Sequence, residues 1–271
     1  MVIDEDRDRR SWRRRSTAGD LLAWGGWLLG ASLFVLCWQL ISEKTIWEFV
    51  WDAPSQAADL GSRMVPPDWR FMSELWRPMW DTLNIATLGT MLALVMAVPV
   101  AFCAARNTTP SVTLVRPIAL FVIVASRSIN SLIWALMLVT IVGPGVFAGI
   151  IAIAIRSIGF CAKLLYEAIE EIDEKQVEAI KATGASGAQI MSYGIVPQVL
   201  PAFAGIAVFR WDINIRESTV LGLVGAGGIG LQLNGAITQL AWTQVSLILL
   251  VIIATVVVSE WVSAKVRHAI I

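Results

Sequence analysis

Residues 167–201 read EAIEEIDEKQVEAIKATGASGAQIMSYGIVPQVLP, and this long polar passage separates two strongly apolar halves of the chain. From Glu167 to Thr183, apolar residues recur at helical spacing among good helix formers, with charged residues between them. This pattern predicts one amphipathic helix over Glu167–Thr183. Gly184 is expected to end it, because glycine adopts the left-handed conformation after a helix without the steric penalty that other residues meet.

A second helix is predicted to begin at Ser186, because Ser186 and Gln189 form an S-x-x-Q capping box. Pro197 and Pro201 are expected to close the unit. Two short helices with a glycine hinge, set between membrane segments, would form a rigid projecting elbow that could transmit force. An ordinary surface hairpin is the alternative that this pattern leaves open.

The composition is typical of a polytopic membrane protein. Of the 271 residues, 56% are hydrophobic and only 15% are charged, and the mean hydropathy is +0.68. The net charge of zero carries little information, whereas the basic residues gather at the ends of predicted spans. The cysteines lie inside apolar runs without a C-x-x-C or Cys/His cluster, so they predict neither a disulfide framework nor a zinc site. They are interpreted as small apolar fillers at Cys37, Cys103 and Cys161.

Residues 1–42 are predicted to be a basic cytoplasmic N-terminus followed by the first transmembrane helix. Six arginines between positions 7 and 15 precede the apolar run Leu21–Ile41, which is long enough to span a membrane. A secretory or twin-arginine signal is the rival interpretation, but the length of the run and the lack of a small-residue cleavage site favour an uncleaved anchor. The arginines place the N-terminus in the cytoplasm by the positive-inside rule.

Residues 43–78 are predicted to be an external, aromatic-rich linker. Its tryptophans fit an aromatic belt at headgroup depth, and contact with an external partner is the alternative. Apolar residues near position 46 suggest a short helix on the membrane surface, which the Pro66-Pro67-Asp68 sequence would break.

Residues 79–271 are predicted to form the core domain, with a cytoplasmic loop at 166–200. Gly143-Pro144-Gly145 is expected to turn the chain tightly, and the apolar stretch Ser111–Ala125 to run along the inner face. The chain is therefore predicted to be an all-α polytopic protein with about six transmembrane helices and both termini in the cytoplasm. After Leu21–Ile41, the predicted spans are Met79–Ala105, Ser128–Val142, Val146–Leu165, Ala202–Leu223 and Val245–Val262.

The last span but one contains charged residues at membrane depth. A charge at the centre of a transmembrane helix costs at least about 2.5–3.5 kcal/mol on insertion scales, so these side chains must face protein, one another or water. Asp212 and Arg216 are four residues apart and can meet on one helix face, whereas Arg216 and Glu217 diverge. The residues predicted to line this interior are Arg156, Arg210, Asp212, Arg216, Glu217 and Ser218.

Two interpretations of these charges remain open. They could be buried pairs that fix the register of the helices. They could instead line a water-filled pathway whose guanidinium groups lower the barrier for an anion, since arginine binds tetrahedral oxyanions in a bidentate manner.

The sequence GAGGIG at 225–230 satisfies the dinucleotide fingerprint G-x-G-x-x-G, but its context excludes that function. The fingerprint requires a preceding strand and an acidic residue about twenty positions later, and here the flanks are predicted spans and positions 245–259 carry no acid. Glycines after a span instead let the backbone turn sharply or approach another helix. The predicted outer gate consists of Gly225, Gly227, Gly228 and Gly230.

The chain carries no constellation typical of an enzyme or a nucleic-acid-binding protein. It has no G-x-x-x-x-G-K-[ST] sequence to hold ATP phosphates, and its one histidine, His268, lies near the C-terminus. Neither a nucleophilic triad nor a metal site is therefore predicted. The dense basic run near the N-terminus is explained by membrane topology.

The elbow resembles the EAA loop of ABC-importer permeases. Glu178-Ala179-Ile180 is followed after three residues by Gly184, and Gly194-Ile195-Val196-Pro197 follows nine residues later. The resemblance implies that Ser186–Tyr193 is a coupling helix that lies in a groove of a separate ATPase subunit. The residues expected to couple the chain to the ATPase are Glu178, Ala179, Gly184, Ala185, Ser186, Gln189, Tyr193 and Pro197.

From about Met64 to the C-terminus, the chain resembles the phosphonate-type branch of these importers. The resemblance is carried by Met64 with Pro66-Pro67-Asp68, by Arg127-Ser128-Ile129 before Leu132–Leu136, by Glu167–Asp173 and by Arg216–Val224. Asn130 replaces a proline that is expected in the family. The resemblance implies a type I ABC importer permease fold.

The resemblance also implies an assembly. It would contain two copies of this chain, two cytoplasmic ATPase subunits that bind ATP and magnesium, and one external solute-binding protein, in the bacterial inner membrane. The chain itself would need no cofactor and bind no nucleic acid. Phosphonates, phosphite, hypophosphite and phosphate esters all remain open as the solute. A secondary transporter driven by an ion gradient, with Asp212 and Glu217 as coupling carboxylates, and a non-transporting membrane scaffold are the alternatives.

Overall fold

The computed structural model describes residues 2–3, 12–13 and 17–270, and the chain divides into two compact units, 1–62 and 63–271. In the first unit, the two-residue strands β1 (Val2–Ile3) and β2 (Trp12–Arg13) pair antiparallel. Most of the predicted cytoplasmic arginine cluster, including Arg7 and Arg15, lies outside the described residues.

Helix α1 (Thr17–Lys44) contains the predicted first span. Its 28 residues rise about 42 Å, more than the hydrocarbon core of a bilayer requires. Helix α2 (Trp47–Arg63) follows it, where the sequence predicted a short helix, and ends before the Pro66-Pro67-Asp68 sequence as expected. Trp47 Nε1 donates to the carbonyl oxygen of Ser42 at 3.2 Å, which fixes the start of α2 against the end of α1.

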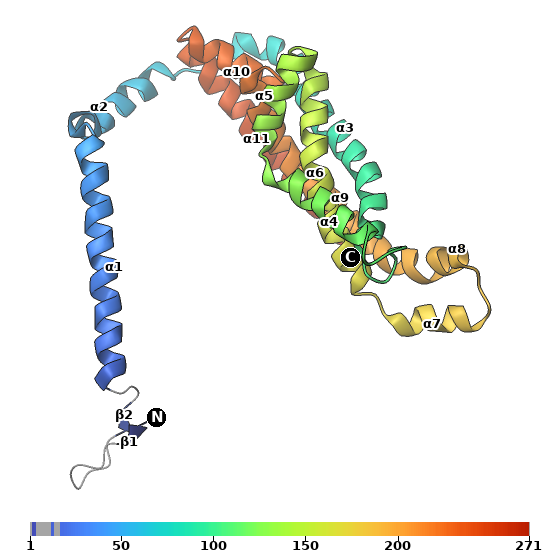
Figure 1. Cartoon of the computed structure of the whole chain (residues 1–271). Coiled ribbons are helices and arrows are strands. Elements are labelled where there is room, and N and C mark those ends of the chain that lie inside the picture. Colours follow the sequence, from blue (N-terminus) through green and yellow to red (C-terminus); the bar gives the residue numbers. More distant parts are fainter. Residues whose placement is uncertain (1, 4–11, 14–16, 271) are drawn as a thin grey trace. The chain divides into compact units, whose positions relative to one another are not determined.

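The second unit is a bundle of helices, and Figure 1 shows α7 and α8 projecting from one end of it, while α10 lies at the other. Five helical segments of the described chain are long and apolar enough to span a membrane, or six if the bent pair α4 and α5 counts as one span. This confirms the predicted all-α polytopic class.

The helices of this unit are η1 (Trp69–Phe71), α3 (Met72–Ala104), α4 (Val115–Ser128), α5 (Ser131–Val142), α6 (Val146–Glu170), α7 (Glu174–Ala182), α8 (Gly187–Ile190), the π-helical η2 (Met191–Ile195), α9 (Val196–Leu221), η3 (Gly222–Val224), α10 (Ile229–Thr238) and α11 (Trp242–Ile270).

The predicted inner-face stretch, Ser111–Ala125, and the predicted third span, Ser128–Val142, correspond to two separate helices, α4 and α5, but Ser128 still belongs to α4 and α5 starts only at Ser131. Helices α4 and α5 meet at an angle of 87°. The 12 residues of α5 rise only about 18 Å, so α5 does not cross a membrane alone. Asn130 causes the new start, because its side chain accepts a hydrogen bond from Leu132 N at 3.1 Å and caps α5.

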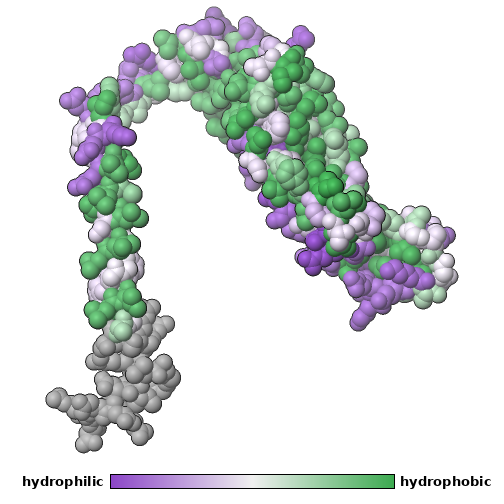
Figure 2. All heavy atoms as spheres, viewed as in Figure 1, coloured by the Kyte–Doolittle hydropathy of each residue, from purple (hydrophilic) through white to green (hydrophobic). Residues whose placement is uncertain are grey.

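Helices α3 and α6 pack closely because small residues line the surface between them. A Cβ atom added at Gly89 of α3 would lie 2.8 Å from Cγ2 of Ile153 on α6, and Ala86, Ala93 and Ala152 are fully buried. Small residues bring helix backbones together where the membrane itself provides no hydrophobic driving force. The outer surface of the bundle is largely apolar along its sides, and polar residues gather on the projecting end (Figure 2).

The elbow differs from the single amphipathic helix that was predicted over Glu167–Thr183. Helix α6 ends at Glu170, and α7 starts after Asp173, whose side chain accepts a hydrogen bond from Lys175 N at 3.0 Å. Aspartate is among the best N-cap residues, so it begins a new helix inside an otherwise helical pattern. Gly184 has a φ of +78°, as expected for a residue that ends a helix in the left-handed conformation.

The predicted capping box is present, but the prolines do not close the unit. Gln189 Oε1 accepts a hydrogen bond from Ser186 N at 2.8 Å. Helix α8 then continues through η2 into α9, so Pro197 lies in the first turn of α9 and Pro201 inside it. Proline is tolerated in a first turn because its missing N–H needs no partner there, and transmembrane helices accommodate internal prolines.

Gly230 allows α10 to pack directly on the end of α9, and Gly230→Ala is expected to destabilise the fold. An added Cβ would lie 2.0 Å from the carbonyl oxygen of Thr219, whereas a Cβ at Gly235 of the same helix meets nothing within 4 Å. Overpacking of this kind lowers the free energy of unfolding by about 1–3 kcal/mol. The unfolding temperature of the purified chain should fall clearly for Gly230→Ala and stay unchanged for the matched control Gly235→Ala. Equal unfolding temperatures of the two variants would contradict the close approach.

Candidate functional site

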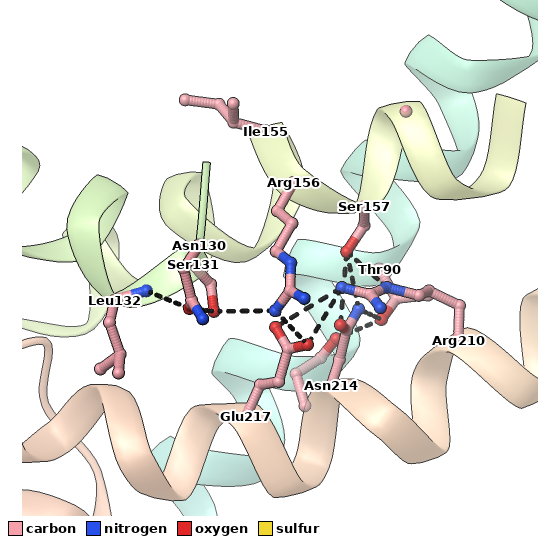
Figure 3. A network of polar contacts seen from close by, with 12 residues as sticks. Thr90, Asn130, Ser131, Leu132, Ile155, Arg156, Ser157, Arg210, Asn214 and Glu217 are labelled. Atoms are coloured by element: carbon pink, nitrogen blue, oxygen red, sulfur yellow. Dashed lines mark hydrogen bonds and ion pairs between the residues drawn. The ribbon is translucent and has the colours of Figure 1, made fainter. Parts of the chain in front are cut away.

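Two of the predicted charges of α9, Arg210 and Glu217, meet Arg156 of α6 in one cluster (Figure 3). Arg156 Nη1 donates to Glu217 Oε1 at 2.7 Å, and Arg210 Nη2 lies 3.5 Å from both oxygens of the same carboxylate. Arg210 and Glu217 are seven residues apart, so two helical turns place them on one face of α9. A single carboxylate therefore lies between two guanidinium groups from neighbouring helices.

Arg210 is held firmly by its surroundings. Its side chain is 3% exposed, its Nε donates to Ser157 Oγ at 2.9 Å, and its guanidinium lies 5.1 Å from the centre of the Phe160 ring. The ring supplies a cation–π contact, which is stronger where water is excluded. Both Ser157 and Phe160 belong to α6, so this arginine joins α9 to α6.

A neutral polar network continues from Arg210 to α3. Asn214 Nδ2 donates to Thr90 Oγ1 at 2.7 Å and to Ser157 Oγ at 3.2 Å. All three side chains are buried, and their hydrogen bonds offset the cost of placing polar atoms there. The network therefore ties α3, α6 and α9 together at the level of the charges.

Asp212 and Arg216 form the ion pair that their spacing predicted. Asp212 also accepts a hydrogen bond from Ser259 Oγ of α11 at 3.0 Å. The Asp212 carboxylate is 9% exposed and the Arg216 side chain is 49% exposed. Asp212 thus holds α11 to α9, while the arginine head extends to the surface of the described chain.

A cavity of about 570 Å³ opens beside these charges. It brings together residues from α5, α6 and α9 and the N-cap of α5. Its polar lining consists of Asn130, Ser131, Arg156, Arg216 and Glu217. Ser218, which was predicted to line the same interior, is fully buried and donates to the carbonyl oxygen of Ile215 at 2.8 Å.

The sequence had indicated the charged residues but not their neutral partners. Ser157, Asn214 and Thr90 are ordinary residues for a transmembrane helix, and only their meeting in space gives them a role. Asn214 lies one helical turn after Arg210, which is the one signal in the sequence that could have marked it.

The glycine turn after α9 lies against the starts of α6 and α10. Gly225, Gly227 and Gly228 have φ values of +88°, +81° and +75°, which glycine adopts readily. Gly145 N, just before α6, donates to the carbonyl oxygen of Gly225 at 3.0 Å. Thr82 of α3 accepts from Ile229 N at 2.8 Å and caps α10. The turn therefore joins α3, α6, α9 and α10 at one end of the bundle.

The predicted coupling residues lie together on the projecting elbow, where they are largely exposed. Tyr193 is 72% exposed. Gln198 of α9, which the sequence had not indicated, connects the two arms of the elbow: its Oε1 accepts from Asp173 N at 2.9 Å, and its Nε2 donates to the carbonyl oxygen of Gly194 at 2.7 Å.

The base of the elbow is also fixed to the bundle. Glu170 Oε1, at the end of α6, accepts hydrogen bonds from Arg106 N at 2.9 Å and from Arg116 Nη2 at 3.4 Å. Asn107 Nδ2 donates to the carbonyl oxygen of Ile169 at 2.6 Å. These contacts fix the base of the elbow to the end of α6, as Gln198 fixes it to the start of α9.

Residues 89–267 match the family described as the binding-protein-dependent transport system inner membrane component. The chain is 41% identical over 210 residues to the phosphite transport system permease protein PtxC of Stutzerimonas stutzeri, covering 78% of this chain and 76% of that one. It is 37% identical over 220 residues to the phosphate-import permease protein PhnE of Mycolicibacterium smegmatis, covering 81% of this chain and 41% of that one.

Solved structures share the fold. A chain of the inward-facing MetNI methionine ABC transporter aligns with a TM-score of 0.65 at 22% identity, covering 75% of this chain and 99% of that one. A chain of a bacterial ABC transporter involved in alginate import aligns with a TM-score of 0.59 at 17% identity, covering 92% and 98%. The chain therefore belongs to the family of inner-membrane components of binding-protein-dependent transport systems, as a multi-pass permease subunit with the type I ABC importer fold.

Proposed function

We propose that this permease carries a small phosphorus oxyanion, such as phosphite, phosphonate or phosphate, into the cell. The observation that supports the proposal is the Arg156–Glu217–Arg210 cluster beside an open cavity, in a chain that is 41% identical to a phosphite permease. Guanidinium groups suit tetrahedral oxyanions because their paired N–H groups match two oxygens at once.

The family and the fold imply partners that supply capture and energy: an external solute-binding protein and a cytoplasmic ATPase. We propose that two copies of the chain line one pathway and that two ATPase subunits hold ATP and magnesium. A two-fold dimer is the usual way for a subunit with a single core to complete such a pathway.

The exposed elbow is the proposed contact with the ATPase. Closure of the ATPase would push on residues 186–193, and the fixed base of the elbow would pass this movement to α6 and α9. We propose that the elbow and both chain termini lie in the cytoplasm, and that the glycine turn lies at the outer side as the gate of the pathway.

The test is the ATPase activity of the purified complex in lipid with its solute-binding protein. Phosphite, several phosphonates and phosphate are each loaded onto the binding protein, and the unloaded protein serves as the control. Stimulation by at least one loaded form is the expected result and would identify the solute. If no ATPase co-purifies and uptake follows an ion gradient, the proposal fails.

A further inference from the structure

The charged cluster contains more cations than anions. Arg156 and Arg210 both pair with Glu217, and Arg216 pairs with Asp212, so the five side chains together carry one net positive charge. Of the ion pairs between described residues, only those with these two carboxylates involve the three arginines. An unbalanced charge at membrane depth is costly, so the cluster favours one additional anion.

The imbalance is concentrated at Glu217. Asp212 pairs with Arg216 and accepts a further hydrogen bond from Ser259, so that pair is balanced. Glu217 is instead shared, since Arg156 binds it at 2.7 Å and Arg210 approaches it at 3.5 Å. Each guanidinium has enough donors to hold a carboxylate of its own.

The two arginines differ in how firmly they are held. Arg210 is buried and fixed by Ser157 and Phe160. The Arg156 side chain is 31% exposed. Its hydrogen bonds to described residues, to Glu217 and to Ser131 at 3.4 Å, both start from Nη1. Nε and Nη2 of Arg156 therefore remain available, within the described part of the chain, to further oxygen atoms.

The two arginines also differ in whether an anion in the cavity can reach them. Arg156 and Glu217 line the 570 Å³ cavity, whereas Arg210 does not. An anion in the cavity would therefore meet Arg156 first, while Arg210 could keep Glu217 behind it. Asn130 and Ser131, at the start of α5, add polar groups to the same wall.

We propose that Arg156 is an oxyanion seat that Glu217 occupies while the pathway is empty, and that a small tetrahedral oxyanion displaces Glu217, which then remains paired with Arg210. This inference rests on the proposed function and adds a mechanism for release. The return of Glu217 expels the anion, so binding stays weak enough for passage.

The first test replaces Glu217 with glutamine, which keeps the size of the side chain and removes its charge. Equilibrium binding of radiolabelled inorganic phosphate and of phosphite is measured on the permease–ATPase complex without binding protein. Nanodiscs of phosphatidylcholine exclude an anionic lipid headgroup as the occupant. Glu217→Gln should bind the anion at least tenfold more tightly than the wild type and transport it more slowly.

Two further variants show whether the gain arises at the seat. Arg156→Gln in the Glu217→Gln background should remove the gained affinity. Lys163→Gln removes a cation from the same helix that pairs with Glu167 at 3.4 Å outside the cluster, so it is the matched control and should bind phosphate as the wild type does. If Glu217→Gln is folded and binds no more tightly than the wild type, the seat is wrong.

A measurement on the wild type keeps the test independent of the folding of any variant. Butanedione modifies exposed arginines, and mass spectrometry follows its reaction at Arg156 and at Arg116. Phosphate should slow modification of Arg156 at least threefold and leave Arg116 unchanged. Equal rates at Arg156 with and without phosphate would overturn the proposal.

The outcomes separate this inference from the proposed function. Stimulation of the ATPase by a loaded binding protein, without a gain of affinity in Glu217→Gln, would sustain the importer and remove the seat. A gain of affinity for phosphate, without stimulation by any loaded form, would sustain the seat and refute the proposed import of these anions from the binding protein.

Discussion

Arg216→Ala is expected to abolish transport while the permease still assembles with its ATPase. Arg216 lines the cavity and its side chain is 49% exposed, so its removal takes from the pathway a guanidinium group that can contact an anion directly. A hydrogen bond to a charged group contributes about 1.5–3 kcal/mol, which corresponds to a loss of roughly 10- to 100-fold in uptake. Uptake of labelled solute into proteoliposomes measures the effect.

A double variant distinguishes a role in the pathway from a role in holding the helices. Arg216→Ala leaves Asp212 with only its hydrogen bond from Ser259, and an uncompensated carboxylate in the membrane is costly. Adding Asp212→Asn removes that charge and should restore the stability of the bundle without restoring uptake. Recovery of uptake in the double variant would show that Arg216 serves only to neutralise Asp212.

The charged residues of the site could be predicted from the sequence, but most of the ion pairs between them could not. Four charges in eight residues of an apolar helix must be functional or mutually paired, and the i, i+4 spacing gave the Asp212–Arg216 pair directly. Glu217 and Arg156, which lie 61 residues apart in the chain, pair across two different helices. Such contacts depend on how α6 and α9 pack, which no local pattern specifies.

The fold shows the same division between local and non-local signals. Gly184 and the capping box at Ser186 were predicted correctly because each depends on a few neighbouring residues. The break at Asp173 was missed because the apolar periodicity continues across it, although aspartate itself is an N-cap signal. The 87° bend between α4 and α5 agrees with the predicted separation of an inner-face stretch from the third span, but the exact break at Asn130 was missed because the apolar composition continues on both sides of it.

Gly184→Val is expected to uncouple ATP hydrolysis from transport. A Cβ at this position would meet nothing of the described chain within 4 Å, so within this chain the effect arises from the backbone alone. The φ of +78° costs a β-branched residue about 1–3 kcal/mol, and the turn between α7 and α8 would relax to avoid it. The elbow would then present residues 186–193 at a different angle, and stimulation of the ATPase by the loaded binding protein should fall at least tenfold.

Two substitutions serve as controls for Gly184→Val. Asparagine tolerates the left-handed conformation, so Gly184→Asn should retain most of the coupling despite its larger side chain. Gly235→Ala, inside α10 and away from the elbow, also adds a Cβ into open space but at a helical position, and it should behave as the wild type. If Gly184→Val keeps full stimulation and uptake, the angle of the elbow does not carry the force, because the only property of Gly184 that valine cannot reproduce is its backbone conformation.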